Sequence, residues 1–339
     1  RLSIRRPPRS TLIRSRRQRQ MCIRDRFGTI INITIRHHDD ALIDSAFKRL
    51  EADFLKMHDI WHPWNPGTLS RTNQLLRSGE WFTASTSILP LMLRSKELAT
   101  QSSQYFNPAV GELVRLWGFH RDNSDQPFQP DMAKIRQLQA DIPSMDDVEV
   151  QGIRMRGLNP NIRIDLGGIA KGYGIDYAIE LLQSMGIQHA VINAGGDLRA
   201  IGSHPDRPWK IGIQHPRQPT VLASLETIKD ESIFTSGDYE RFYLEEEHRR
   251  HHIIDPTSGA PVTHTMAATV IHPQATVADA AATALLAAGA NNLVSLTTSM
   301  GITQVMLMTA EGELVLSRQM QRRLEMNNNL NLKLRIIDL

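Results

Sequence analysis

The pattern of apolar and polar residues changes its period several times along the chain, and each change predicts a new element. The stretch "FGTIINITIR" alternates and is rich in β-branched residues, which predicts a strand over 28–36. Apolar residues then recur at helical spacing over 41–58, after two aspartates that can cap a helix. Two prolines and a glycine in "IWHPWNPGTLSRTN" predict a loop over 60–73, and a second amphipathic helix is expected over 87–102.

The rest of the chain mixes strands and helices. Strands are predicted over 148–164 (a hairpin), 189–196, 209–216, 228–235, 241–244 and 266–271, and in a closing hairpin of "TQVMLMT" and "ELVLS". Helices are predicted over 131–140, from the turn near 168 to about 185, over 276–288 and over 292–300. Because hairpins and helices are mixed and no repeat is visible, the pattern indicates an α+β fold rather than a regular βαβ series.

Composition limits the class of protein. Of the 339 residues, 41% are hydrophobic and 22% are charged, which fits a soluble globular protein. No run of about 18 apolar residues is present, so no membrane span is predicted. The single cysteine, Cys22, lies near the start of the chain. The remaining residues contain no cysteine, so disulfides and thiolate catalysis are excluded there. An absence of thiols suits an exported protein.

The formal net charge of +3 conceals an uneven distribution. Residues 1–26 contain ten arginines and one aspartate, which leaves the remainder mildly acidic, at −6. This segment lacks both the apolar centre of a signal peptide and helical periodicity. We expect it to be a disordered basic tail, foreign to the fold and similar to translated linker DNA, so that a native N-terminus with any export signal is missing. A genuine tail that binds nucleic acid or anionic lipid by charge is the alternative.

One glycine-rich turn could bind an anion. In "IDLGGIAKGYGID" (164–176), Gly167 and Gly168 lie at a predicted helix start, where free N–H groups and the helix dipole favour negative charge. The turn is not a Walker loop, because Lys171 precedes Gly172 and no Ser or Thr follows the pair in the required order. Asp165 suits a ribityl hydroxyl, a ring N–H or a metal. A capped turn with a surface lysine is the simpler alternative.

Two further stretches contain groups for metal binding and proton transfer. In "VADAAATALLAAG", Asp279 and Thr283 share one helix face and could hold Mg²⁺, unless the hydroxyl bonds back to the carbonyl of residue 279. In "HHIIDPTSGAPV", His251 or His252 could deprotonate a hydroxyl, with Asp255 orienting it or fixing the turn. A polar turn that merely ends a strand is the alternative.

An aromatic pair could bind a planar ligand. Trp61 and Trp64 of "WHPWNPG" could stack on such a ligand, or they could pack in the core.

In their order along the chain, these stretches resemble the ApbE family of FAD:protein FMN transferases from residue 27 to about 318. The matching motifs are "FGT", "FNPAVGELVRLWGF", "IDLGGIAKGYGID", "VINAGGDLRAIG", "TSGDYERF", "HHIIDPTSGAPV" and "ADAAATALLAAG". The resemblance implies a two-lobed α+β fold over 27–320, with mixed, largely antiparallel sheets and flanking helices. Residues 321–339 would then be a C-terminal tail.

The resemblance also implies a reaction and a site. FMN would pass from FAD to a threonine hydroxyl of a target protein through a phosphoester bond, with Mg²⁺ present and AMP released. By position, Asp279, Thr283 and the Gly168 carbonyl would hold the metal, and His252 would be the base. The residues that would contact FAD are Ala109, Val110, Gly111, Asp165, Lys171 and Ile254.

The chain departs from the family pattern at two places. Phe27 stands where methionine is common, and the loop near residue 63 lacks the usual tyrosine. Trp64, or else Trp61, is therefore expected to stack on the flavin.

The implied partner is a subunit of a redox complex that carries a threonine in a flavinylation motif. The implied location is the periplasm or the outer face of a bacterial cytoplasmic membrane, with membrane attachment expected only through a lipid anchor on the missing native N-terminus. Nucleic acid is not an expected partner. An FAD pyrophosphatase that yields FMN and AMP, or a flavin carrier without catalysis, is the alternative. The sequence does not specify the acceptor or the oligomeric state.

Overall fold

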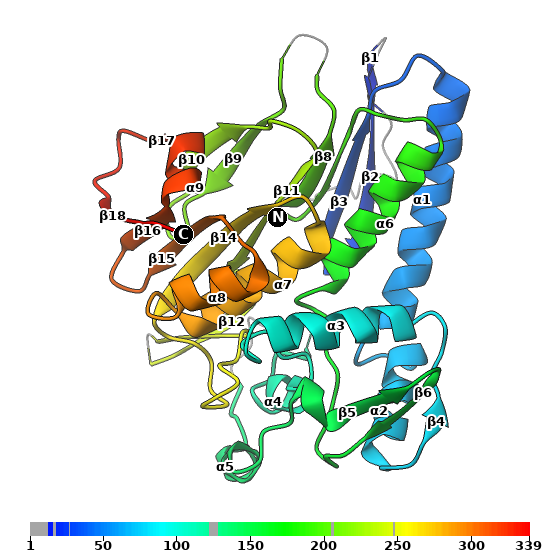
Figure 1. Ribbon diagram of the computed structural model, residues 1–339, viewed down its shortest axis with the longest axis vertical. Coiled ribbons are helices and arrows are strands. Elements are labelled where there is room, and N and C mark those ends of the chain that lie inside the picture. Colours follow the sequence, from blue (N-terminus) through cyan, green and yellow to red (C-terminus); the bar gives the residue numbers. More distant parts are fainter. Residues whose placement is uncertain (1–12, 16–17, 27, 122–127, 205–206, 247) are drawn as a thin grey trace, which may run out of the picture.

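A ten-stranded sheet forms the centre of the molecule (Figure 1). The computed structural model describes residues 13–15, 18–26, 28–121, 128–204, 207–246 and 248–339. In spatial order the strands are β1 (Ile13–Ser15), β2 (Gln18–Arg26), β3 (Thr29–Ile35), β7 (Ala190–Ala194), β8 (Asp197–Ile201), β11 (Glu231–Gly237), β14 (Thr265–His272), β15 (Gln304–Thr309), β16 (Glu313–Ser317) and β18 (Lys333–Ile337). All neighbours pair antiparallel except β16 and β18, which are parallel. The predicted α+β class is confirmed.

Helices cover one face of this sheet. They are α1 (Asp40–Trp61), α6 (Ala170–Ser184), α7 (Ala275–Ala288) and α8 (Leu293–Met300). The alternation of side chains along each strand explains the packing, since Val305 and Leu307 of β15 join the core under the helices. The intervening Met306 and Met308 join a second core on the opposite face.

That opposite face is covered by a small sheet and a short helix. The small sheet has the order β17 (Glu325–Met326), β10 (Val221–Glu226) and β9 (Lys210–Gln214), and α9 (Arg318–Arg323) lies beside it. The larger sheet is therefore buried on both faces along its middle strands. This explains why several of its strands are apolar at consecutive positions.

A third group of elements lies at one end of the large sheet, at the bottom of Figure 1. It consists of α2 (Thr68–Arg77), α3 (Leu89–Gln101), α4 (Gly111–Leu116), α5 (Met132–Gln139) and a 3₁₀ turn (Met145–Asp147), with the strands β4 (Phe82–Thr83), β5 (Val148–Gln151) and β6 (Arg154–Gly157). The hairpin of β12 (Phe242–Glu245) and β13 (His248–His251) contributes Tyr243 to the apolar cluster of α4 and α5. None of the described helices is long and apolar enough to cross a membrane.

The basic N-terminal segment differs from its prediction. Residues 18–26 are not a disordered tail but the strand β2, which pairs with β3. Met21 and Ile23 are buried in the main core, which supplies the apolar contact that holds the strand. The arginine count concealed this short alternation of polar and apolar residues. Residues 1–12 lie outside the described residues, as does Phe27.

Two other segments also differ from their predictions. The loop predicted over 60–73 is helical from Thr68, because Leu69, Thr72 and Leu76 repeat at helical spacing and are buried. The predicted C-terminal tail is structured as well, since β18 adds a parallel strand to the edge of the main sheet at β16.

Candidate functional site

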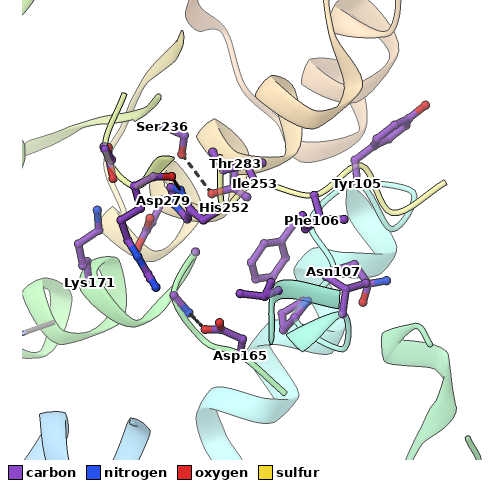
Figure 2. Close-up of a pocket in the computed structure, with 18 residues that line it drawn as sticks. Tyr105, Phe106, Asn107, Asp165, Lys171, Ser236, His252, Ile253, Asp279 and Thr283 are labelled. Carbon is purple, nitrogen blue, oxygen red and sulfur yellow. Dashed lines mark hydrogen bonds between the residues drawn. The ribbon is translucent and has the colours of Figure 1, made fainter. Parts of the chain in front are cut away.

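A cavity opens where the N-terminal ends of α6 and α7 meet the strand β11 and the hairpin β12–β13. Figure 2 shows Ser236, Thr283, Asp279 and His252 gathered on one side, with Asp165 and Phe106 facing them. The cavity is lined by Tyr105, Phe106, Asn107, Pro108, Val110, Val114, Asp165, Gly167, Gly168, Lys171, Ser236, Glu240, Arg241, His252, Ile253, Ile254, Asp279 and Thr283. Three of these side chains are acidic, and three are basic if His252 is counted with Lys171 and Arg241.

Helix α7 is held so that its first turns face the cavity. Asp176 of α6 accepts hydrogen bonds from the backbone N–H groups of Ala275 and Thr276, both at 2.8 Å, and so caps α7 from a neighbouring helix. The two helices approach closely because Gly172 has no side chain: a Cβ there would lie 2.3 Å from the carbonyl oxygen of Ala275. The backbone N–H of Gly172 donates to Oδ2 of Asp279 at 2.8 Å.

Asp279 is a buried carboxylate whose charge is only partly compensated. Burial raises its pKa to about 7, against the lowering effect of Lys171. Its second oxygen has no hydrogen-bond partner among the described residues. A divalent cation at this oxygen would supply the compensation that the protein does not.

Two other oxygen atoms belong to the same wall. The Thr283 hydroxyl lies 3.1 Å from that of Ser236, rather than bonding back to the carbonyl of residue 279. A Cβ on Gly168 would lie 3.0 Å from Oγ1 of Thr283, so the backbone of the glycine turn passes directly beside this hydroxyl. The predicted trio of Gly168, Asp279 and Thr283 therefore converges on one cavity.

Lys171 is less available than the sequence suggested. Its ammonium forms an ion pair with Asp197 of β8, whose other oxygen accepts the Thr235 N–H at 2.8 Å. Burial by itself would lower the pKa of Lys171, but the carboxylates of Asp197, Glu240 and Asp279 outweigh it and raise the pKa. Lys171 is thus charged and lines the cavity, but it is already paired.

His252 has the features of a general base. Its Nδ1 lies 3.3 Å from the backbone carbonyl of Arg241, which fixes the proton on Nδ1 and leaves Nε2 unprotonated. Burial within the protein lowers its pKa well below the usual value, and Arg241 and His251 lower it further. The side chain is half-buried, and the cavity gives it its access to solvent. His252 is therefore neutral near pH 7 and able to accept a proton.

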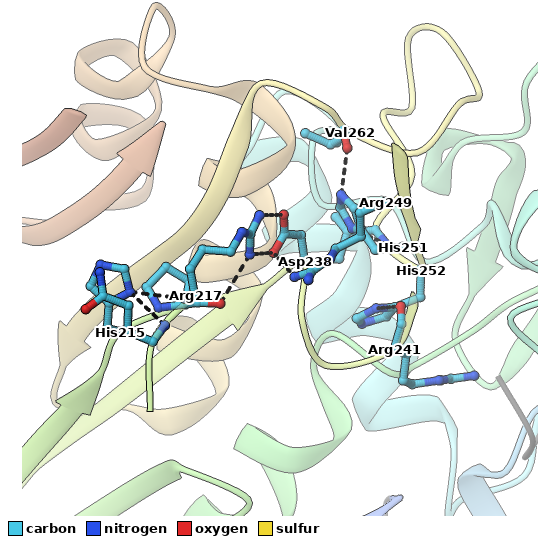
Figure 3. A network of polar contacts seen from close by, with 11 residues as sticks. His215, Arg217, Asp238, Arg241, Arg249, His251, His252 and Val262 are labelled. Atoms are coloured by element: carbon cyan, nitrogen blue, oxygen red, sulfur yellow. Dashed lines mark hydrogen bonds and ion pairs between the residues drawn. The ribbon is translucent and has the colours of Figure 1, made fainter. Parts of the chain in front are cut away.

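Several polar contacts lie close to His252 (Figure 3). His251 is buried, and its Nε2 lies 2.6 Å from the carbonyl oxygen of Val262. Nearby, Asp238 accepts two hydrogen bonds from Arg217, at 2.7 and 2.5 Å, and lies 3.4 Å from Arg249. Because His251 is buried and hydrogen-bonded to Val262, His252 is the histidine that faces the cavity.

The predicted flavin contacts divide into two groups. Val110, Asp165, Lys171 and Ile254 line the cavity. Ala109 and Gly111, by contrast, are buried and do not line it.

Gly111 has a structural reason for its residue type. Its N–H donates to the Arg163 carbonyl at 2.9 Å, and a Cβ would lie 2.6 Å from that oxygen.

The turn residues show which of the simpler alternatives hold. Asp165 accepts the Gly167 N–H at 2.9 Å, so it caps its turn in addition to lining the cavity. Asp255 fixes its own turn by accepting from Thr257 at 2.9 Å and from Ser258 at 2.8 Å. The structure therefore supports a role for Asp255 in fixing the turn rather than in orienting a histidine.

Neither tryptophan lines this cavity. Trp61 is buried, donates from its indole to the Ser87 carbonyl at 3.2 Å, and packs edge-on against Tyr173. Its expected stacking on a flavin is therefore wrong. Trp64 lines a separate cavity with Arg71, Arg77 and Arg163, where the Arg163 guanidinium lies 5.6 Å from its ring centre.

Sequence reasoning assigned no role to several residues that the structure brings to the site. Ser236, Glu240 and Arg241 all come from the motif "TSGDYERF", which follows an apolar strand. The dense polar cluster at that strand end was the available signal. Asp197 was missed as well, and only the fold reveals it, because its partner Lys171 lies 26 residues away.

Metal binding has to be argued from mixed oxygen ligands. The described residues contain no cluster of three or more His, Cys, Asp or Glu side chains that could hold a metal ion. However, Mg²⁺ commonly uses one or two carboxylates, substrate phosphates and several waters. The carboxylate of Asp279, the hydroxyl of Thr283 and the carbonyl of Gly168 fit that pattern.

Comparison with known proteins gives consistent results. A family model described as "ApbE family" matches residues 27–307. The chain is 34% identical over 299 residues to an FAD:protein FMN transferase from Rhodobacter capsulatus, covering 88% of this chain and 57% of that protein. It is 33% identical over 225 residues to an enzyme of the same name from Vibrio cholerae, covering 65% of this chain and 66% of that protein.

Solved structures are similar too. The ApbE protein from Thermotoga maritima matches with a TM-score of 0.80 at 25% identity, covering 93% of this chain and 99% of that one. The flavin transferase ApbE from Vibrio cholerae matches with a TM-score of 0.76 at 26% identity, covering 90% and 99%.

Proposed function

The chain belongs to the ApbE family, and from this premise we propose that it transfers FMN from FAD to a threonine hydroxyl of an acceptor protein, with Mg²⁺ present and AMP released. The observation that carries the proposal is the convergence of Asp279, Thr283 and a neutral His252 on one cavity. The names of the Rhodobacter and Vibrio relatives support the transferase activity.

The charges of the cavity support a divalent cation. Asp165, Glu240 and Asp279 line it, against Lys171 and Arg241, and Asp197 already engages Lys171. When all three carboxylates are ionised, an anionic pyrophosphate would meet net negative charge there unless another cation were present. Bound Mg²⁺ would polarise the phosphate oxygens and stabilise charge that develops on them.

The protein's own groups would manage the proton and the orientation. The threonine hydroxyl gives its proton to Nε2 of His252, because the Arg241 carbonyl keeps the other ring nitrogen protonated. The hydroxyl oxygen then bonds to the phosphorus of the FMN half, and the bond from that phosphorus to the AMP phosphate breaks. The glycine turn at 167–168 lets backbone approach the phosphates closely.

Trp64 would contact the flavin if FAD extended beyond the cavity that contains His252. The Val110–Arg163 backbone bridge separates the two cavities, and each member of the bridge lines one of them. A flavin ring that passed this bridge would meet the Trp64 indole.

We also propose that the acceptor is a redox-complex subunit and that the reaction takes place in the periplasm or at the outer face of a bacterial cytoplasmic membrane. Family membership supports this part of the proposal.

Analysis of the products tests the proposed reaction. The protein is incubated with FAD, Mg²⁺ and an acceptor domain that carries a threonine flavinylation motif, and nucleotides are then separated from protein. Transfer requires AMP and protein-bound flavin in equal amounts. Free FMN in place of bound flavin would indicate the pyrophosphatase, and bound but unconsumed FAD would indicate a carrier.

A further inference from the structure

The cavity has two cationic side chains, and their surroundings are very different. Lys171 forms an ion pair with Asp197, so its charge is compensated inside the protein. Arg241 forms no ion pair with a carboxylate among the described residues. Its guanidinium donates to the backbone carbonyl of Phe119, a neutral group, and the neighbouring Glu240 is a carboxyl whose charge acts on it without an ion pair.

The other arginines near the hairpin are already paired. Arg217 and Arg249 both bind Asp238, and Arg250 binds Glu245 at 2.8 Å. None of these three lines the cavity of His252. Arg241 is exposed as well as cavity-lining, and Figure 3 shows its guanidinium extending away from the Asp238 network. Of the described arginines and lysines, it is therefore the one whose charge is available to an anion in this cavity.

The backbone of the same residue also serves the reaction. The Arg241 carbonyl accepts the backbone N–H of His252 at 3.1 Å and orients its imidazole through Nδ1. An anion bound by the side chain would consequently lie near the base that the main chain orients. One residue thus links the position of the phosphate to the position of the proton acceptor.

We infer that Arg241 is a catalytic residue that binds the pyrophosphate of FAD and stabilises the departing AMP phosphate. This inference rests on the proposed function. In the transfer step the threonine oxygen bonds to the FMN phosphorus and its proton moves to Nε2 of His252. The electron pair of the broken phosphorus–oxygen bond leaves with AMP, and the guanidinium neutralises the charge that gathers there.

The test compares three variants by their kinetics. Arg241→Met removes the charge and keeps most of the stem, Arg241→Lys keeps the charge, and Arg250→Met removes a paired arginine from the same hairpin. We expect Arg241→Met to lower kcat/KM for FAD by about 10²-fold, a typical effect of losing one transition-state donor. Arg241→Lys should lose less, and Arg250→Met should retain activity. Thermal unfolding of each variant checks that it folds.

Two readouts separate this role from a structural one. Added guanidinium ion should restore part of the rate of Arg241→Met, since a free cation can occupy the vacated position. AMP should also bind Arg241→Met at least tenfold more weakly than it binds the wild type, as measured by calorimetry without turnover. A variant that merely loosened the contact with Phe119 would show neither effect.

The outcomes distinguish this inference from the proposed function. If the wild type transfers FMN, but Arg241→Met matches Arg250→Met in rate and in AMP affinity, the inference is overturned and the function stands. If the wild type transfers no FMN, but AMP affinity falls in Arg241→Met alone, the anion contact stands and the function does not.

Discussion

If Asp279 holds the proposed cation, this one side chain couples cation binding to pH. Burial raises its pKa to about 7, whereas cation binding requires the ionised form. A proton and the proposed cation would therefore compete for the same carboxylate close to neutrality. Burial also raises the pKa of Glu240, a second carboxyl of the cavity.

The expected result is that apparent Mg²⁺ affinity falls as pH is lowered from 8 to 6. Below pH 7 the fall should approach about tenfold per pH unit, because each cation bound must displace one proton. Mg²⁺ titrations followed by thermal shift at several pH values measure this. An affinity that did not change across this range would show that Asp279 is not a ligand.

The protonation state of His252, unlike that of Asp279, should not change over this pH range. Because its pKa lies well below the usual value, it stays neutral and basic through the pH range in which Asp279 titrates. At saturating Mg²⁺, the rate of FMN transfer should therefore hold nearly constant from pH 8 down to pH 6.5.

Replacing His252 with alanine should lower the transfer rate by about 10²–10⁴-fold, the range for loss of a general base. FAD binding should change little, since the imidazole acts on the acceptor hydroxyl. Rates from pH 6 to 8 and FAD titrations, for wild type and variant, test both expectations. Unimpaired transfer in His252→Ala would eliminate the histidine as the base.

At the scale of elements, the site depends on the contact between α6 and α7. Asp176 caps α7, and the Gly172 N–H donates to Asp279. Both contacts therefore position the face of α7 that we propose binds the cation. The residue type at position 172 is decisive, because backbone atoms of α7 lie where a side chain would be.

Gly172→Ala should destabilise the protein by about 1–3 kcal/mol, even though alanine favours helices, because the added methyl group would meet the Ala275 carbonyl. The matched control is Gly212→Ala in β9, where the new Cβ would lie 3.5 Å from Val221, an ordinary contact distance. Urea unfolding of both variants measures the difference. Equal stability would mean that the helices are not in the close contact described here.

The strand β2 offers a second test at this scale. Ile23 is 4% exposed and packs in the main core, so Ile23→Ala should cost about 2–5 kcal/mol. The exposed Gln20 on the same strand provides the control, and Gln20→Ala should leave the unfolding midpoint almost unchanged. If Ile23→Ala were also neutral, residues 18–26 would be the disordered tail that their composition predicts.

At the scale of the whole molecule, elements that depend on local sequence patterns could be predicted from the sequence. An element that depends on pairing with a distant strand could not. The strand β3, the helix α1 and the hairpin of β15 and β16 follow from periodicity and capping within each segment. The segment that became β18 could not be recognised in this way, because its strand depends on pairing with β16.

The features of the candidate site fall into the same two groups: those that local motifs predict and those that only the fold reveals. Gly168, Asp279, Thr283 and His252 lie in motifs that could be read locally, and the structure brings them together. By contrast, the compensation of Lys171 by Asp197 and the open charge of Arg241 depend on which elements meet in space. For Trp64 the local sequence was a weaker guide. Its loop led to the prediction of a flavin contact, but the structure places Trp64 beyond the Val110–Arg163 bridge.

The central claim is that this cavity joins FMN to an acceptor threonine. The most direct measurement is the intact mass of an acceptor domain after incubation with FAD, Mg²⁺ and the wild type, His252→Ala or Asp279→Ala. We predict a mass gain of one FMN with the wild type, and little or none with either variant or with an acceptor whose threonine is replaced by alanine. An acceptor that gained FMN equally with all three proteins, or with none of them while each stayed folded, would contradict the account.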